Sequence, residues 1–150
     1  MVNEEKEKEV TLTGNQIAGL LQSERAKINS VAQQLNQIQA IIAEINGSIE
    51  ALKELGKQKN PQTMVQLGAG VMIEAKIEDC ENAKITLPGN IVVNQQREQA
   101  IKTLSKQAEN AKGQSEELQK QFNQIAANIN SLEKIVQTAQ RQIRKQQKDN

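Results

Sequence analysis

An apolar stripe at heptad spacing is the feature that most constrains this chain of 150 residues. From Ile17 to Leu52, apolar side chains recur at alternating intervals of four and three residues, and only Glu24 interrupts them. A stripe sustained over five heptads, with Gln, Asn, Ser and charged residues around it, is typical of a coiled-coil helix. The apolar positions are Ile17, Leu21, Ile28, Val31, Leu35, Ile38, Ile42, Ile45, Ile49 and Leu52.

The second half of the chain carries a matching stripe. Between Ile101 and Ile143, twelve of thirteen heptad positions are apolar, and Ser115 is the exception. At about 1.5 Å per residue, the first stripe spans roughly 53 Å and the second roughly 63 Å. Because these lengths match, we expect an antiparallel hairpin of helices. The apolar positions are Ile101, Leu104, Ala108, Ala111, Leu118, Phe122, Ile125, Ile129, Leu132, Val136, Ala139 and Ile143.

Capping residues give the expected bounds of both helices. Thr13 fits an N-cap whose capping box is closed by Gln16, and Gly56 followed by Pro61 ends the first helix. Asn94 is the expected cap of the second helix. The sequence therefore predicts a flexible tail at 1–12, coiled-coil helices at 13–56 and 95–145, an intervening segment at 57–94 and a flexible tail at 146–150.

One dipeptide inside the first stripe allows two interpretations. Asn46-Gly47 is a common turn sequence. The heptad spacing nevertheless passes through it unbroken from Ile42 to Leu52. We therefore expect a helix interior that the glycine weakens by about 1 kcal/mol. A flexible joint in the helix is the alternative.

Between the stripes the apolar period changes from 3.5 to 2, which predicts strands. Three turn segments, Gly68-Ala69-Gly70, residues 78–82 and Pro88-Gly89-Asn90, divide this region into two β-hairpins. Their shared apolar face cannot be covered by helices that run away from it, so we expect it to meet sheets of other chains. The predicted oligomerisation residues are Val65, Leu67, Val71, Ile73, Ile77, Ile85, Leu87, Ile91 and Val93.

The composition argues against an enzyme. The chain has no His, and Phe122 is its single aromatic residue, so the usual proton-transfer side chain and metal ligand are missing. Gly68-Ala69-Gly70 lacks the Gly-Lys-Ser/Thr run of a phosphate loop. A net charge of +1 does not indicate nucleic-acid binding, and no apolar run is long enough for a membrane span. We expect no cofactor or metal and a cytoplasmic protein, in which Cys80 forms no internal disulfide.

The middle of the chain resembles one protein family. The segment Val65-Gln66-Leu67-Gly68-Ala69-Gly70-Val71, followed by an acidic loop and a second hairpin at Ile85 to Val93, is similar to the alpha-type subunit of archaeal prefoldin. The resemblance implies a hexamer of two alpha-type and four beta-type subunits, in which the hairpins join an oligomeric β-barrel. It also implies an ATP-independent co-chaperone that captures non-native proteins and passes them to a group II chaperonin.

The far ends of the helices are the expected client-binding sites. A two-helix seam is exposed on both flanks, so its apolar side chains gain less than the roughly 1.5 to 3 kcal/mol of complete burial. At the free end no other element supports the pair, and splaying there exposes apolar surface. Several such tips around one cavity would bind non-native chains through linked weak contacts. The predicted client-binding residues are Ile17, Leu20, Leu21, Leu132, Val136 and Ile143.

Two other hypotheses differ from a co-chaperone in class. A structural or filament-forming prefoldin-like protein would assemble from this chain alone, without a partner subunit. An enzyme or nucleotide-binding protein would need reactive side chains that the sequence does not offer. Sedimentation of the purified chain separates the first from the co-chaperone, and a nucleotide-binding measurement tests the second.

Overall fold

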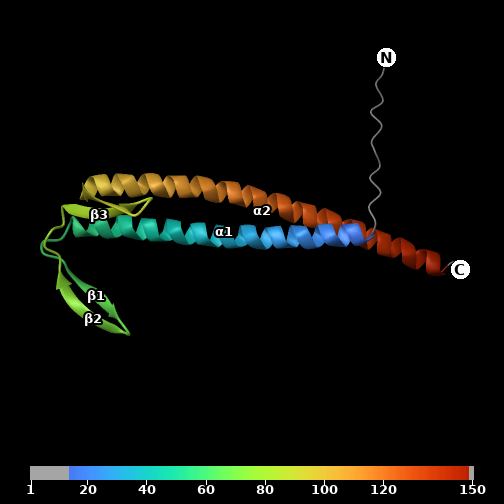
Figure 1. The fold of residues 1–150 in the computed structure, drawn as a ribbon, viewed down its shortest axis with the longest axis horizontal. Coiled ribbons are helices and arrows are strands. Elements are labelled where there is room, and N and C mark those ends of the chain that lie inside the picture. Colours follow the sequence, from blue (N-terminus) through green and yellow to red (C-terminus); the bar gives the residue numbers. More distant parts are fainter. Residues whose placement is uncertain (1–13, 149–150) are drawn as a thin grey trace, which may run out of the picture. The chain divides into compact units, whose positions relative to one another are not determined.

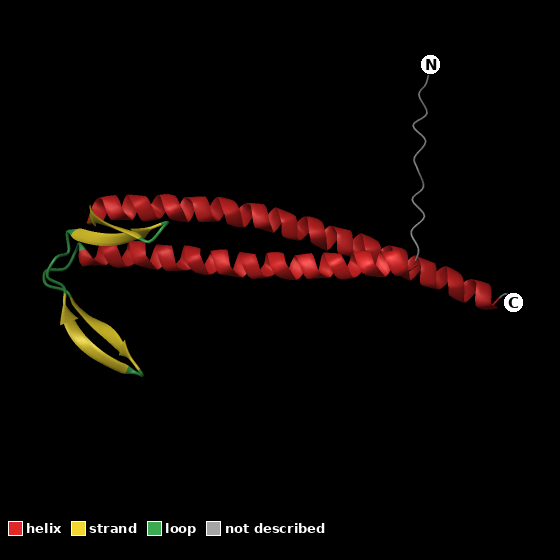
Figure 2. Ribbon diagram, in the orientation of Figure 1, coloured by secondary structure: helices red, strands yellow, loops and turns green. Residues whose placement is uncertain are grey.

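The computed structural model describes residues 14–148, and these form two long helices with two antiparallel β-hairpins between them (Figures 1 and 2). This confirms the predicted fold class. The elements in chain order are α1 (Gly14–Leu55), β1 (Gln62–Gly68), β2 (Val71–Lys76), β3 (Asn82–Leu87), β4 (Ile91–Gln96) and α2 (Arg97–Lys148). The chain divides into two compact units. Of the described residues, 14–35 and 117–148 form one unit, and 36–116 form the other.

The bounds of α2 differ from the expected ones at both ends. The expected cap of α1, Thr13, lies outside the described residues. Asn94 does not cap α2, because it continues β4 and pairs with Lys84. The helix begins instead at Arg97, whose backbone N–H donates to the carbonyl oxygen of Glu81 at 2.7 Å. At its other end α2 continues to Lys148, since Gln, Lys and Arg have high helix propensity and no glycine or proline interrupts the last turn.

Helix α1 runs unbroken through Asn46-Gly47, which confirms the helical interpretation of that dipeptide. A Cβ atom added at Gly47 would meet no atom within 4 Å. We expect Gly47→Ala to raise the free energy of unfolding by about 1 kcal/mol, because alanine restricts the unfolded chain and exposes less backbone. Chemical denaturation measures this. Gly89→Ala is the control and should destabilise, since Gly89 has a φ of +86°. A flexible joint that function requires would instead show as lost activity in Gly47→Ala.

The first hairpin pairs β1 with β2, from Gln62 opposite Lys76 to Gly68 opposite Val71. Its two-residue turn has positive φ at both positions, 48° at Ala69 and 80° at Gly70, as a type I′ turn requires. The register shifts by one residue between Gln66 and Gly68, which marks a β-bulge. All residues of β1 are exposed, and in β2 only Ala75 is half-buried.

The second hairpin, β3 with β4, packs on the helices of its own unit. It runs in register from Asn82 opposite Gln96 to Leu87 opposite Ile91. Ile85 of β3 is only 8% exposed, and with Leu52 of α1 and Leu104 of α2 it lines one open groove. In Figure 1, β3 lies between the parts of α1 and α2 that belong to this unit. The other buried residues of this unit are Ile49, Pro61, Ala100, Ala108 and Ala111.

The expectation that the helices leave the apolar face of both hairpins uncovered is therefore wrong for β3–β4. The alternating pattern identified the correct face, because Ile85 and its cross-strand partner Val93 are buried and half-buried. That face meets the helices of the same chain. Ala83 and Ile85 of β3 line one groove with Leu52 of α1 and with Leu104 of α2, so the strand lies against both helices of its unit.

Candidate functional site

The first candidate surface is the free end of the helical pair, within the unit formed by residues 14–35 and 117–148. Of the predicted client-binding residues, Ile17 is buried at 9% exposure, and Leu20 is 44% exposed. Leu21, Leu132 and Val136 are half-buried. The side chain of Ile143 lies outside the described part of the structure. The seam is thus closed at Ile17 and open at its flanks.

The heptad pattern did not indicate one apolar residue of this surface. Ile135 is 49% exposed on α2, next to the seam residue Val136. It lines a shallow hollow of about 340 Å³ together with Lys134, Thr138, Ala139 and Gln142. Ile135 lies off the heptad positions, so the stripe gave no reason to select it. The sequence did offer one signal for this site: a large apolar residue outside the heptad stripe, on a face of the helix that is otherwise polar.

A polar cluster joins α1 to α2 beneath the tip. The carboxylate of Glu24 accepts hydrogen bonds from Lys27 Nζ at 2.7 Å and from Asn128 Nδ2 at 3.2 Å. Arg25 Nη2 donates to Glu133 Oε1 at 2.8 Å. Glu24 interrupts the apolar stripe and its side chain is only 13% exposed. A polar residue at one seam position fixes the register of a coiled coil at a cost in stability.

The charge state of Glu24 links the tip to pH. Hydrogen bonds from Lys27 and Asn128 hold the pKa of Glu24 below its ordinary value of 4.5. A lowered folded pKa means that Glu24 stabilises the fold above about pH 4.5, and that this contribution is lost as the pH falls through the folded pKa. In the unmodified chain, we expect the stability of this unit to fall as the pH is lowered, and in Glu24→Gln we expect a smaller fall. Amide hydrogen exchange of residues 17–31 at several pH values measures this. Glu44→Gln, which changes an exposed carboxylate of the same helix, should show the same fall as the unmodified chain. An equal fall in Glu24→Gln and in the unmodified chain would contradict this role.

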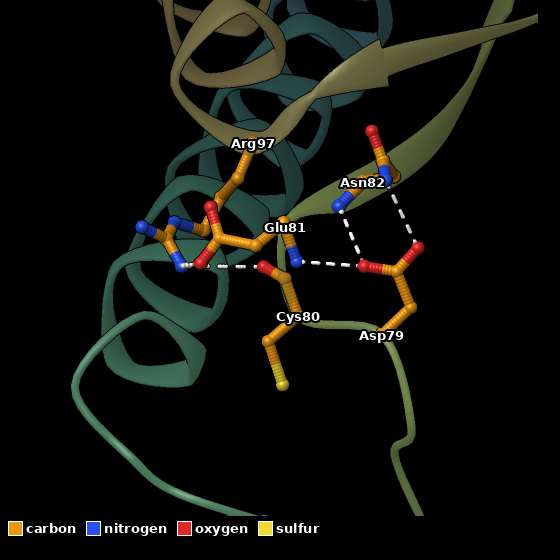
Figure 3. A network of polar contacts seen from close by, with 5 residues as sticks. All are labelled: Asp79, Cys80, Glu81, Asn82 and Arg97. Atoms are coloured by element: carbon orange, nitrogen blue, oxygen red, sulfur yellow. Dashed lines mark hydrogen bonds and ion pairs between the residues drawn. The ribbon is translucent and has the colours of Figure 1, made fainter.

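A second polar network lies at the other end of the helices (Figure 3). Asp79 accepts hydrogen bonds from the backbone N–H groups of Glu81 and Asn82, at 2.9 and 3.1 Å, and from Asn82 Nδ2 at 3.0 Å. These bonds, first that of the Asn82 side chain, lower the pKa of Asp79. Arg97 Nη1 donates to the Cys80 carbonyl oxygen at 3.2 Å and to Glu81 Oε1 at 3.3 Å. The half-buried Cys80 thus contributes its backbone to this network.

Arg97 also explains why a glycine follows α1. A Cβ atom at Gly56 would lie only 2.5 Å from Arg97 Cζ. The guanidinium therefore occupies the space beside Gly56 at the C-terminal end of α1, where the helix dipole favours a positive charge. Arg97 joins the end of α1, the β2–β3 connection and the start of α2. This network therefore ties the connection between the two hairpins to the ends of both helices.

The second candidate surface is the β1–β2 hairpin. Its predicted oligomerisation residues are exposed, with fractions of 40% at Val65, 63% at Leu67, 54% at Val71 and 47% at Ile73. Ile77, which follows β2, is half-buried. Met64 and Met72 expose apolar surface on the opposite face of the same hairpin. In β3–β4 only Ile91 is exposed among the predicted residues, since Leu87 and Val93 are half-buried and Ile85 is buried.

Among residues 14–148, no group of three or more His, Cys, Asp or Glu side chains is placed to hold a metal ion. Neither helix in this part of the chain is both long and apolar enough to cross a membrane.

Comparison with known proteins identifies the family. The family model described as Prefoldin subunit matches residues 25–142. Prefoldin subunit alpha of Methanococcoides burtonii is 32% identical over 108 residues, which are 71% of this chain and 78% of that protein. Prefoldin subunit alpha of Thermofilum pendens is 26% identical over 121 residues, or 77% of this chain and 94% of that protein.

A solved structure agrees with the fold. The cryo-EM structure of filamentous PFD from Methanocaldococcus jannaschii has a TM-score of 0.64 with this chain at 20% sequence identity, and the match covers 75% of this chain and 93% of that one. At this identity the likeness concerns the fold alone. Together with the family model, which spans most of the two helices and all four strands, it leads to one conclusion. The chain belongs to the prefoldin subunit family.

Proposed function

We propose that this protein is an ATP-independent co-chaperone subunit that captures non-native proteins with the tips of its helices and passes them to a group II chaperonin. Prefoldins are chaperones and not enzymes, and they act as oligomers with other prefoldin subunits. The proposal adds client capture at the tips, transfer to a chaperonin and a cytoplasmic location. It also includes a hexamer with beta-type subunits, whose hairpins form a shared β-barrel.

The observation that carries the proposal is the pattern of exposure at the free end of the helices. Leu20 and Ile135 are 44% and 49% exposed, and the seam between them is only partly covered at Leu21, Leu132 and Val136. Isolated exposed apolar residues are ordinary, but here they flank a half-buried apolar seam in one unit. Partial opening of the seam would add its side chains to the same surface. Such a surface suits any chain that displays apolar residues, without sequence specificity.

The tip residues can be tested without removing the helices. Replacing Leu20, Leu21, Leu132 and Val136 with serine should leave the hairpin unit able to assemble, because all four residues lie outside residues 36–116. The assembly should lose most of its ability to keep an unfolded model protein from aggregating, measured by light scattering. Ile41→Ser is the matched control, since Ile41 is 50% exposed on the same helix but belongs to the other unit. Full protection by the four-serine variant would show that clients bind elsewhere.

A further inference from the structure

The last part of α2 carries a concentrated positive charge. Residues 134–148 contain five basic residues and no acidic residue, in a chain whose net charge is only +1. Across from this segment, residues 14–23 at the start of α1 carry no charged side chain at all. Among the residues that the structure describes, the tip that presents the exposed apolar residues therefore also carries a net positive charge.

The basic side chains share one face of α2. With 3.6 residues per turn, Lys134, Arg141, Arg144 and Lys145 fall within an arc of about 100°, roughly opposite the seam residues Leu132 and Val136. All four are exposed. Among residues 14–148, the described ion pairs involve none of these four. We call this set of four residues the basic stripe.

An apolar hollow adjoins the basic stripe. Lys134 lines the hollow of about 340 Å³ together with Ile135, Thr138, Ala139 and Gln142. One surface therefore offers a recess for an apolar side chain and, beside it, cations for carboxylates. Arginine is suited to the second task, since its guanidinium forms paired hydrogen bonds with a carboxylate.

We propose that the basic stripe makes the tip selective for acidic stretches of non-native proteins, in which aspartate or glutamate alternates with apolar residues. This inference rests on the proposed function, because it names the class of client that the tip prefers. Charge complementarity favours an acidic protein segment over a nucleic acid, since no aromatic side chain stands in residues 134–148 to stack on bases. It favours an acidic segment over a membrane surface because Ile135 is the single large apolar residue lining the adjoining hollow.

The test compares three synthetic peptides of equal length, in which leucine alternates with glutamate, glutamine or lysine. Binding to the assembled protein is measured by fluorescence anisotropy at low and high salt. We expect the glutamate peptide to bind about tenfold more tightly than the glutamine peptide at low salt, and the lysine peptide to bind most weakly. The advantage of the glutamate peptide should shrink to about twofold near 0.5 M salt, where exposed charges are screened within a few ångströms.

A matched pair of variants assigns the effect to the basic stripe. Replacing Lys134, Arg141, Arg144 and Lys145 with glutamine should remove the preference for the glutamate peptide and leave binding of the glutamine peptide within about twofold. The control variant replaces four exposed lysines elsewhere on α2 with glutamine and should keep the preference for the glutamate peptide. These lysines are Lys102, Lys106, Lys112 and Lys120. Circular dichroism checks that both variants retain their helices. If both variants lost the preference equally, net charge rather than the basic stripe would be responsible, and the proposal would be wrong.

Other outcomes separate this inference from the proposed function. Equal binding of the glutamate and glutamine peptides would overturn charge selectivity and leave client capture standing. Failure of all three peptides to bind would overturn both. Tighter binding of single-stranded DNA or anionic lipid vesicles than of the glutamate peptide would assign the basic stripe to a different partner. Binding of the glutamate peptide only after removal of residues 1–13 would assign the surface to the glutamates of the chain's own N-terminal segment.

Discussion

Glutamate in place of both Val65 and Ile73 is expected to abolish assembly of the chain. These two residues face each other across β1 and β2, and both are exposed in the isolated chain, at 40% and 47%. In an interface each side chain would contribute roughly 1.5 to 3 kcal/mol, and two carboxylates buried without partners would add a penalty. We expect association to weaken by about a thousandfold or more. Native mass spectrometry, with and without a beta-type prefoldin subunit, measures the result.

Two controls limit the interpretation of this experiment. Gln62→Glu with Gln66→Glu adds the same charge to polar positions of β1, and assembly should persist. The double glutamate variant should also keep its helix content, since Val65 and Ile73 are exposed in the chain by itself. Normal assembly of the double glutamate variant would mean that β1–β2 is not the interface. Long polymers of the unmodified chain alone would support the filament-forming alternative over a hexamer with beta-type subunits.

Ile85→Ala is expected to destabilise the chain itself, by about 2 to 4 kcal/mol. Ile85 is 8% exposed and lines a groove with side chains of both helices, so its loss leaves a cavity between β3 and the helical pair. Protection of β3–β4 amides against hydrogen exchange should fall in parallel. The measurement is cleanest in the double glutamate variant, where association does not contribute to stability.

Ile91→Ala is the matched control, because Ile91 belongs to the same hairpin but is 59% exposed. Its effect on the stability of the unassembled chain should stay within about 0.5 kcal/mol. If Ile85→Ala and Ile91→Ala had equal small effects, the packing of β3 on the helices would contribute little. Ile85 would then belong with the interchain residues, as the sequence pattern suggested.

The order of helices and hairpins was predictable because it depends on local patterns. The seven-residue repeat defines α1 and α2, and the two-residue repeat with its turn sequences defines the four strands. Ala69 and Gly70 adopt the positive φ that a tight hairpin turn requires. The family resemblance rested on the same turn and was confirmed. These features need no knowledge of which segments come together in space.

What covers each apolar face was not predictable from such patterns. Alternation showed that Ile85 and Val65 stand on apolar faces, but one face packs on the chain's own helices and the other is exposed. The cap at Asn94 failed for a related reason: asparagine is favoured at a helix N-cap and disfavoured in strands, yet pairing with β3 carries β4 through Asn94 to Gln96. Glu24 stood out as an interruption of the stripe, yet its bond to Asn128 became visible only once α1 and α2 were placed side by side in their unit.

Because only one of the two hairpins is covered by the chain's own helices, the synthesis of this subunit must be matched to that of its partners. In a newly made chain, β3–β4 packs on the chain's own helices, but β1–β2 has unpaired strand edges and exposed apolar side chains on both faces. Exposed apolar strands with unpaired edges tend to pair edge to edge with other copies of themselves. Until it assembles, the subunit exposes apolar surface of the kind that promotes aggregation, as do the non-native proteins that it is proposed to bind. Synthesis in step with its assembly partners would therefore protect the cell from a surplus of orphaned chains.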